Sequence, residues 1–170
     1  MSVNIEVTVE DKQWFEEDNL IINDIKLVIL KILPFTELAK FVTEDNLELE
    51  ISILLTNDSK IKQLNKIYRG KNQPTNVLSF PASSSEQIAK PRSDFPLILG
   101  DIVLSLQTVK QQALQQNKSL KNHIYHLLVH SILHLIGYDH KSSEEADLME
   151  SLEIKILKKL DIDNPYIISE

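Results

Sequence analysis

The 170-residue sequence contains no cysteine, which excludes disulfide frameworks, thiolate zinc fingers and cysteine nucleophiles. It also lacks long apolar runs, since stretches such as 127–129 and 132–133 are short and interrupted by polar residues, and we therefore expect no membrane span. The start of the chain has no basic segment followed by an apolar one, so we expect no secretory signal. With 42% hydrophobic and 25% charged residues, the chain is predicted to form one soluble, cytoplasmic domain over residues 1–170.

Positive charge is scarce but locally concentrated. The net charge of −7 gives the chain little general attraction for nucleic acid, because phosphate binding requires Lys and Arg to displace counterions. Residues 59–85, however, contain no Asp or Glu. We name the five basic residues of this segment the basic strip: Lys60, Lys62, Lys66, Arg69 and Lys71. By itself the strip is typical of a solvated helix face, although it can also bind or steer a phosphate chain.

Hydrophobic periodicity predicts strands early in the chain and helices late. Alternating apolar residues indicate strands, and apolar residues at helical spacing indicate helices. The predicted strands are 3–9, 47–55, 77–80 and 98–104, and the predicted helices are 20–33, 58–68, 105–116, 120–136 and 142–160. Residues 82–96, rich in Ser and Pro, are predicted to be a surface loop. This order favours an α+β fold, a small mixed sheet of about four strands packed with about five helices.

The second predicted helix has two features that the structure can test. Asp58 or Ser59 is expected to cap its N-terminus. Its apolar side is expected to contain Ile61, Leu64, Ile67 and Tyr68.

All five histidines lie between residues 123 and 140. His130 and His134 are four residues apart on a predicted helix, so both side chains lie on one side of it. Gly137 allows the backbone to leave the helix in a left-handed conformation, which can return His140 to the same point. Three neutral imidazoles with a fourth position open to water are typical of a catalytic zinc. We expect His126 to neighbour this site and His123 to be exposed to solvent.

The spacing of these ligands also matches the metzincin protease pattern H-E-x-x-H-x-x-G-x-x-H. The general base of those proteases is the Glu after the first His, and here that position is Ser131. The methionine turn is missing as well, because the only methionines are Met1 and Met149. A working peptidase is therefore disfavoured.

Three segments together resemble a known family. HSILHLIGYDH is similar to the H-G-x-L-H-L-x-G-Y-D-H motif of the YbeY family of metal-dependent endoribonucleases. Upstream, LNKIYRGKNQPTNVLSFP and LGDIVLS resemble two further blocks of that family, in the same order. Two positions depart from its pattern: Ser131 replaces a Gly, and Asn76 replaces an Asp. If the family Asp orients a histidine or a water, the change should weaken activity, whereas if it caps a turn, Asn is nearly equivalent.

The resemblance implies a zincin-like fold with one Zn²⁺ per chain, bound by His130, His134 and His140. It further implies that Arg69 and His134 are catalytic, and that the substrate is single-stranded RNA. The expected role is maturation of the 3′ end of small-subunit rRNA and ribosome quality control, in the cytoplasm, with no DNA or membrane partner. The basic strip would then contact the RNA backbone.

Other interpretations stay open. A zinc-stabilised, ribosome-associated RNA-binding module with weak or no catalysis would use the same residues, and a metalloprotease ranks third. Asp139 is either a partner of His140 or a turn cap, and Tyr138 is expected to pack in the core. The general base, and the choice between hydrolysis and transesterification, are not determined by the sequence.

Overall fold

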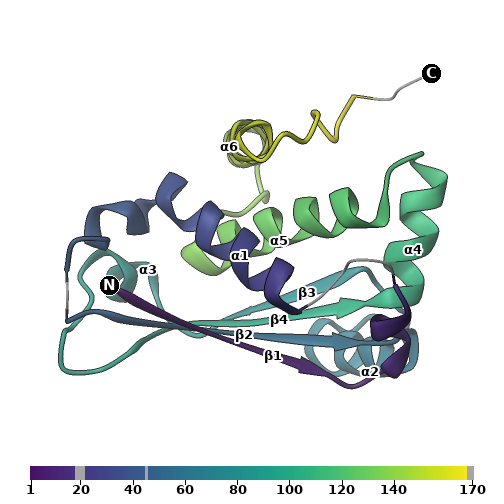
Figure 1. The fold of residues 1–170 in the computed structure, drawn as a ribbon, viewed down its shortest axis with the longest axis horizontal. Helices are drawn as coiled ribbons and strands as arrows, with labels where there is room; N and C mark the ends of the chain where they lie inside the picture. The colour runs from purple at the N-terminus through teal and green to yellow at the C-terminus, as the bar shows by residue number, and fades with distance from the viewer. Residues whose placement is uncertain (18–21, 45, 168–170) are drawn as a thin grey trace.

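The computed structural model describes residues 1–17, 22–44 and 46–167. At its centre lies a four-stranded sheet with the order β1-β2-β4-β3 (Figure 1). The strands β1 (Ser2–Val9), β2 (Glu48–Thr56) and β4 (Leu97–Ser105) run parallel to one another, and β3 (Val77–Pro81) pairs antiparallel with β4. The expected mixed sheet of four strands in an α+β fold is confirmed.

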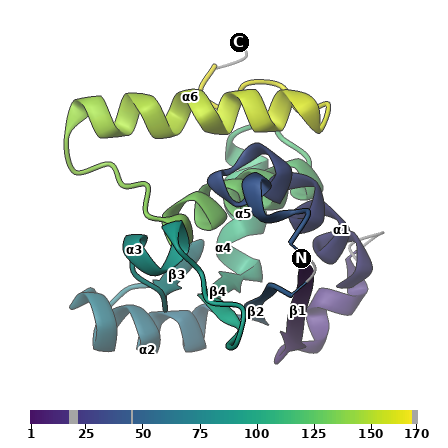
Figure 2. The ribbon, with the colours of Figure 1, turned by 90° about the vertical axis from the view of Figure 1, so that its left-hand side faces the viewer.

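The helices form layers on the two faces of this sheet. The helices α1 (Ile22–Ile32) and α5 (Leu120–Ile136) cover one face, and α2 (Asp58–Arg69) lies against the other (Figure 1). The last helix, α6 (Ser143–Lys159), lies over α5 on the side away from the sheet (Figures 1 and 2). Between β4 and α5 the chain forms α4 (Leu106–Gln115). The main core thus lies between the sheet and α5, with α6 closing its outer side.

The described residues contain more helices than the five that were expected. Three short 3₁₀ helices occur at Lys12–Glu16, Leu33–Phe35 and Glu37–Phe41. The first two residues of the helix expected at 20–33 lie outside the described residues. No helix within the described ranges combines the length and the apolar character needed to cross a bilayer.

One α-helix, α3 (Ser85–Ala89), was not expected. It lies within the segment 82–96 that was predicted to be a loop, so this prediction was wrong in part. The Ser84 hydroxyl accepts a hydrogen bond from the Gln87 backbone, and the Gln87 side chain accepts one from the Ser84 backbone. This reciprocal cap stabilises a single turn. Ile88 adds a buried contact, with 2% of its surface exposed.

For α2, the expected N-cap was wrong and the expected apolar side was wrong in part. Its N-cap is Asn57, whose side chain accepts from the Lys60 backbone, because Asp58 instead accepts hydrogen bonds from the hydroxyls of Ser105 and Thr108. Its apolar side is also narrower than expected, with Ile67 and Tyr68 exposed. Of the four expected residues, Ile61 is buried and Leu64 is partly buried, both at the small cluster of Ile61, Leu78 and Val103 on this face of the sheet.

Candidate metal centre

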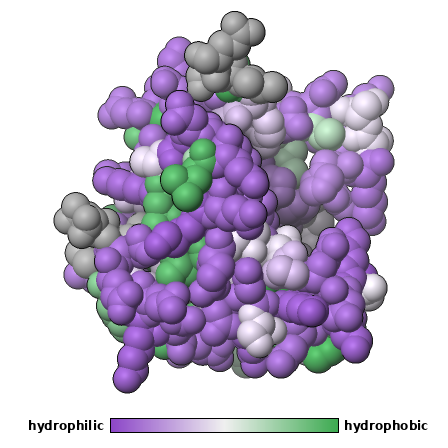
Figure 3. All heavy atoms as spheres, turned by 90° about the vertical axis from the view of Figure 1, so that its right-hand side faces the viewer, coloured by the Kyte–Doolittle hydropathy of each residue, from purple (hydrophilic) through white to green (hydrophobic). Residues whose placement is uncertain are grey.

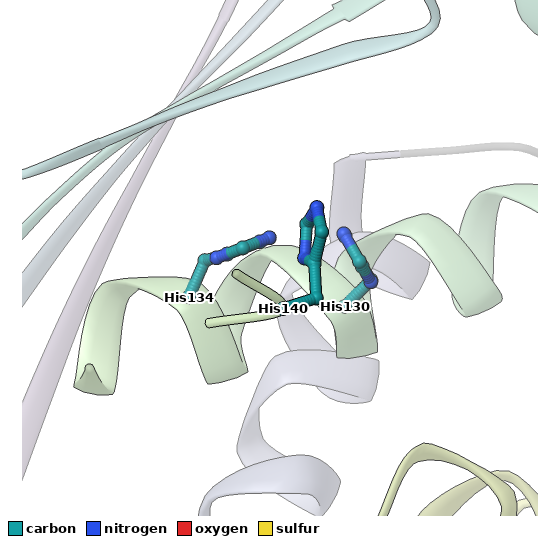
Figure 4. A group of neighbouring side chains, drawn as sticks. All are labelled: His130, His134 and His140. Carbon is teal, nitrogen blue, oxygen red and sulfur yellow. The ribbon is translucent and has the colours of Figure 1, made fainter. Parts of the chain in front are cut away.

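The three histidines of the predicted site come together at the C-terminal end of α5. His130 and His134 lie one turn apart on this helix. Gly137 ends the helix with φ 118° and ψ 0°, a left-handed conformation that a residue with a side chain rarely adopts. The chain then turns back, and one ring nitrogen from each of His130, His134 and His140 lies within 4.8 Å of the other two (Figure 4). The predicted grouping is confirmed.

These imidazoles fit a divalent metal. Burial, followed by the neighbouring imidazoles of His130 and His140, lowers the pKa of His134 from 6.5 to about 4. His134 is therefore neutral at physiological pH and has a lone pair to donate. Three neutral imidazoles are the donor set of catalytic zinc sites, although nickel and copper accept the same set.

Sequence reasoning missed two residues beside this cluster. Glu153 on α6 is fully buried and contacts His130 Nδ1 with one carboxylate oxygen, and the Tyr166 hydroxyl donates to its other oxygen. Burial alone would raise the pKa of Glu153, but the nearby imidazoles of His126 and His130 outweigh it and the pKa falls to about 2. One signal was available: Glu153 shares helical spacing with the buried residues Met149, Ile156 and Leu157.

The two remaining histidines have different surroundings. His126 neighbours the cluster as expected, with its ring 6.5 Å from that of His130. The expectation that His123 is exposed was wrong, because only 2% of its surface is accessible. Gln112 on α4 faces its Nε2 at 2.9 Å and supplies the polar partner that makes this burial possible.

The histidine cluster opens into a cavity of about 960 Å³. Its walls come from α5, β3, the end of α2 and the segment after Gly137. The side of the molecule drawn in Figure 3 is mostly hydrophilic and is hollowed on one side. Basic side chains in the cavity wall are Arg69, Lys71 and Lys141, of which Lys141 was not predicted. The cavity therefore has both polar and apolar walls and is partly basic.

Arg69 is held without an acidic partner. Its Nη2 donates to the Ser79 carbonyl at 2.9 Å, and its guanidinium lies over the Phe80 ring, 5.1 Å from the centroid. Among the described residues no carboxylate forms an ion pair with it. Of the rest of the basic strip, Lys71 lines the cavity, while the described lining does not include Lys60, Lys62 or Lys66.

The two departures from the family pattern lie in different environments. Asn76 lines the cavity, accepts a hydrogen bond from the Val77 backbone at 2.7 Å and donates to Gln112 at 2.9 Å. Its side chain therefore stabilises a turn and holds Gln112, the partner of His123, and among the described residues it forms no hydrogen bond with the three clustered histidines. Ser131 is fully buried, and its hydroxyl has no hydrogen-bond partner within the described part of the chain.

Two residues around His140 have structural contacts. Asp139 accepts a hydrogen bond from the His140 backbone at 2.7 Å, which lowers the pKa of its carboxyl group. Because the bond is to the backbone of His140, it favours the role of Asp139 as a turn cap over its role as a partner of the His140 side chain. Tyr138 packs against the main core, as expected.

Comparison with known proteins adds independent information. The family model described as Endoribonuclease YbeY matches residues 9–161. Endoribonuclease YbeY of Bartonella bacilliformis is 41% identical, covering 96% of this chain and 97% of that protein. Endoribonuclease YbeY of Colwellia psychrerythraea is 46% identical, covering 78% of this chain and 81% of that protein.

Among solved structures, the solution structure of TM1509 from Thermotoga maritima is similar in fold. The two chains superpose with a TM-score of 0.55 at 21% sequence identity, over 93% of this chain and 92% of the other. At this identity the likeness concerns the fold.

Proposed function

The chain belongs to the YbeY family of endoribonucleases, and from this premise we propose that it is a zinc-dependent enzyme that cleaves single-stranded RNA. We further propose that residues 1–170 act as one domain in the cytoplasm, on the 3′ end of small-subunit rRNA and in ribosome quality control. The observation that carries the proposal is the three-histidine cluster opening into the same cavity as Arg69.

His130, His134 and His140 would hold the zinc ion, and a set of three histidine ligands would leave a coordination position for water or substrate. When bound, zinc polarises a phosphoryl oxygen and lowers the pKa of a coordinated water. The cavity of about 960 Å³ can admit more than one nucleotide, in keeping with a polymeric substrate.

Arg69 is suited to the scissile phosphate. Its permanently charged guanidinium can donate two parallel hydrogen bonds to phosphate oxygens. The Ser79 carbonyl and the Phe80 ring orient it, and in the described residues no carboxylate neutralises it. We infer that Arg69 stabilises the charge that develops on the phosphate during cleavage.

Within the basic strip the geometry favours some residues over others. Lys71 lines the cavity and is the strongest candidate for an RNA-backbone contact beside Arg69. Lys141, in the segment after Gly137, lines the same cavity and is a further candidate. Lys60, Lys62 and Lys66 are proposed as contacts only for RNA that extends beyond the cavity.

The test is cleavage of a labelled single-stranded RNA by wild-type protein and by Arg69→Ala, His134→Ala, Lys71→Ala and Lys62→Ala, each checked by circular dichroism. We expect loss of cleavage for His134→Ala and a drop of about 10²–10³-fold for Arg69→Ala. With an RNA short enough to stay within the cavity, Lys71→Ala should weaken binding and reduce its salt dependence, and Lys62→Ala, which lies outside the described lining, is the matched control. Duplex RNA and single-stranded DNA serve as substrate controls. Equal cleavage by all five proteins would assign the activity to a contaminant.

One observation favours a second candidate, the zinc-stabilised RNA-binding module. The described lining of the cavity has one carboxylate, Asp139, which caps a turn through one of its oxygens, while Glu153 is buried and engaged by His130 and Tyr166. If the folded, zinc-loaded wild type binds RNA but does not cut it, this candidate replaces the nuclease. A protease is disfavoured by Ser131, and casein digestion lost in His134→Ala would be needed to restore it.

A further inference from the structure

The carboxylate of Glu153 lies in the core between α6 and α5, with none of its side-chain surface exposed. Its Oε1 contacts His130 Nδ1, its Oε2 accepts from the Tyr166 hydroxyl, and His126 Nε2 lies 3.6 Å away. Over the described ranges, neither Lys nor Arg pairs with it. Every polar contact of this buried acid is therefore directed to the histidine face of α5 or to the C-terminal segment.

Packing alone does not explain an acid at this position. Its neighbours on the buried side of α6 are Met149, Ile156 and Leu157, and an apolar side chain of similar size would complete that face. Burying a carboxylate is unfavourable unless it is paired and hydrogen-bonded, so an apolar residue would be the better choice for stability. The acid must serve the group that it contacts.

That group is a side chain of the candidate metal centre. When Nδ1 of a neutral histidine carries the proton and donates a hydrogen bond to a carboxylate, the lone pair of the ring is on Nε2. A carboxylate at this position fixes both the tautomer and the orientation of the ring, and makes the ring a stronger ligand. His130 has this arrangement, because the contact with Glu153 occupies Nδ1 and leaves Nε2.

We propose that Glu153 is a positioning residue of the metal centre: it orients His130 so that Nε2 is offered to the metal, and Tyr166 in turn orients the carboxylate through its second oxygen. The inference rests on the metal centre proposed above and extends it to α6 and the segment that follows. Glu153 and Tyr166 lie 13 and 26 residues after His140, the last ligand in the sequence. Removing this support weakens metal binding without touching a ligand.

The experiment compares Glu153→Gln with Glu150→Gln, the same chemical change at an exposed position three residues earlier on α6. Tyr166→Phe removes only the hydroxyl that orients the carboxylate. Zinc affinity is measured by competition with a chromophoric chelator, and the absorption spectrum of the Co²⁺-substituted protein reports the ligand geometry. Thermal melts with and without zinc separate metal binding from folding.

We expect Glu153→Gln to bind zinc about 10–100-fold more weakly, Tyr166→Phe to show a smaller loss, and Glu150→Gln to match wild type. The Co²⁺ spectrum should shift in Glu153→Gln, and the rise in Tm on adding zinc should shrink. Because Gln is isosteric and keeps an acceptor for His130, the variant is expected to fold.

Unchanged zinc affinity and an unchanged Co²⁺ spectrum in Glu153→Gln overturn this inference alone, as does an equal loss of Tm with and without zinc. A wild-type protein that binds no zinc overturns the metal centre and this inference together. RNA cleavage enters none of these readouts, so a failure of the proposed nuclease activity is seen separately.

Discussion

At the scale of single residues, the partner of a side chain decides its role more than its type does. His123 and His130 lie two turns apart on α5, yet His123 is buried against Gln112 of α4 while His130 contacts Glu153 of α6. Asn76 similarly owes its role to Gln112, whose oxygen it shares with His123. Replacing such a residue therefore tests a contact that no sequence pattern predicts.

Asn76→Asp should be nearly neutral for folding. Its Oδ1 can still accept from the Val77 backbone, and Gln112 can rotate its amide so that Nε2 donates both to the new carboxylate and to His123 Nε2, with the ring proton of His123 moved to Nδ1. We expect a change in the free energy of unfolding below about 1 kcal/mol, whereas Asn76→Ala, which loses both hydrogen bonds, should cost about 1–3 kcal/mol. Urea unfolding measures both. An Asp variant less stable than the Ala variant would contradict this account of the turn.

His123 should make the protein sensitive to mild acid. Burial, and then the charges of His126 and Lys118, lower its pKa from 6.5 to about 4. Between these pH values the unfolded chain binds a proton that the native state does not, so stability is lost as the pH falls from about 6.5 to about 4. We expect His123→Gln to lose less stability than wild type between pH 7 and pH 4.5, measured by urea unfolding in EDTA. If the free energy of unfolding falls equally with pH in wild type and in His123→Gln, His123 is not the source of the acid sensitivity.

At the scale of elements, the metal centre depends on how α5 ends. Two ligands belong to the helix and the third follows it, so the direction in which the chain leaves Gly137 determines whether His140 reaches the other two. The left-handed cap at φ 118° sets that direction. The neighbouring elements then complete the centre, α6 with Glu153 and α2 with Arg69.

Gly137→Ala should disturb this arrangement more than Gly70→Ala disturbs the end of α2. Both glycines have positive φ, but a Cβ at Gly70 meets nothing within 4 Å, whereas at Gly137 it meets the Ser85 hydroxyl at 3.1 Å. We expect a loss of about 1 kcal/mol for Gly70→Ala and about 3 kcal/mol for Gly137→Ala. Zinc affinity should fall only in Gly137→Ala. Equal losses in the two variants would mean that neither the larger φ of Gly137 nor its contact with Ser85 adds to the cost of a Cβ.

At the scale of the whole molecule, the core and the metal centre are largely separate. Most of the core consists of apolar side chains between the sheet and the covering helices α1 and α5, and the buried Glu153 joins it to His130 of the metal centre. The clustered histidines are half-buried or exposed at its edge. Folding is therefore expected to rest on the core and not on the metal.

Chelation tests this separation. EDTA should lower the Tm, because a ligand that binds only the native state stabilises it, but should leave the far-ultraviolet circular dichroism spectrum unchanged at room temperature. Loss of helical signal on chelation would instead identify a structural zinc, and would favour the RNA-binding module over the nuclease.

Local patterns in the sequence determined the four strands, the long helices and the three clustered histidines. Alternation and helical spacing act over neighbouring residues, and the His130–His134–Gly137–His140 spacing lies within a single helix and its cap. The short helix α3 was missed because its stability comes from one reciprocal cap and one buried contact, signals too weak to distinguish from a loop.

Only the tertiary structure decided which distant side chains meet. Gln112 of α4 meets His123 across 11 residues of sequence, Glu153 of α6 meets His130 across 23, and Tyr166 of the C-terminal segment meets Glu153 across 13. The burial of His123 and the exposure of Ile67 and Tyr68 follow from which helix faces find a neighbour. Periodicity states that a face is apolar or polar, whereas the element packed against it determines what that face contacts, and packing is a property of the whole chain.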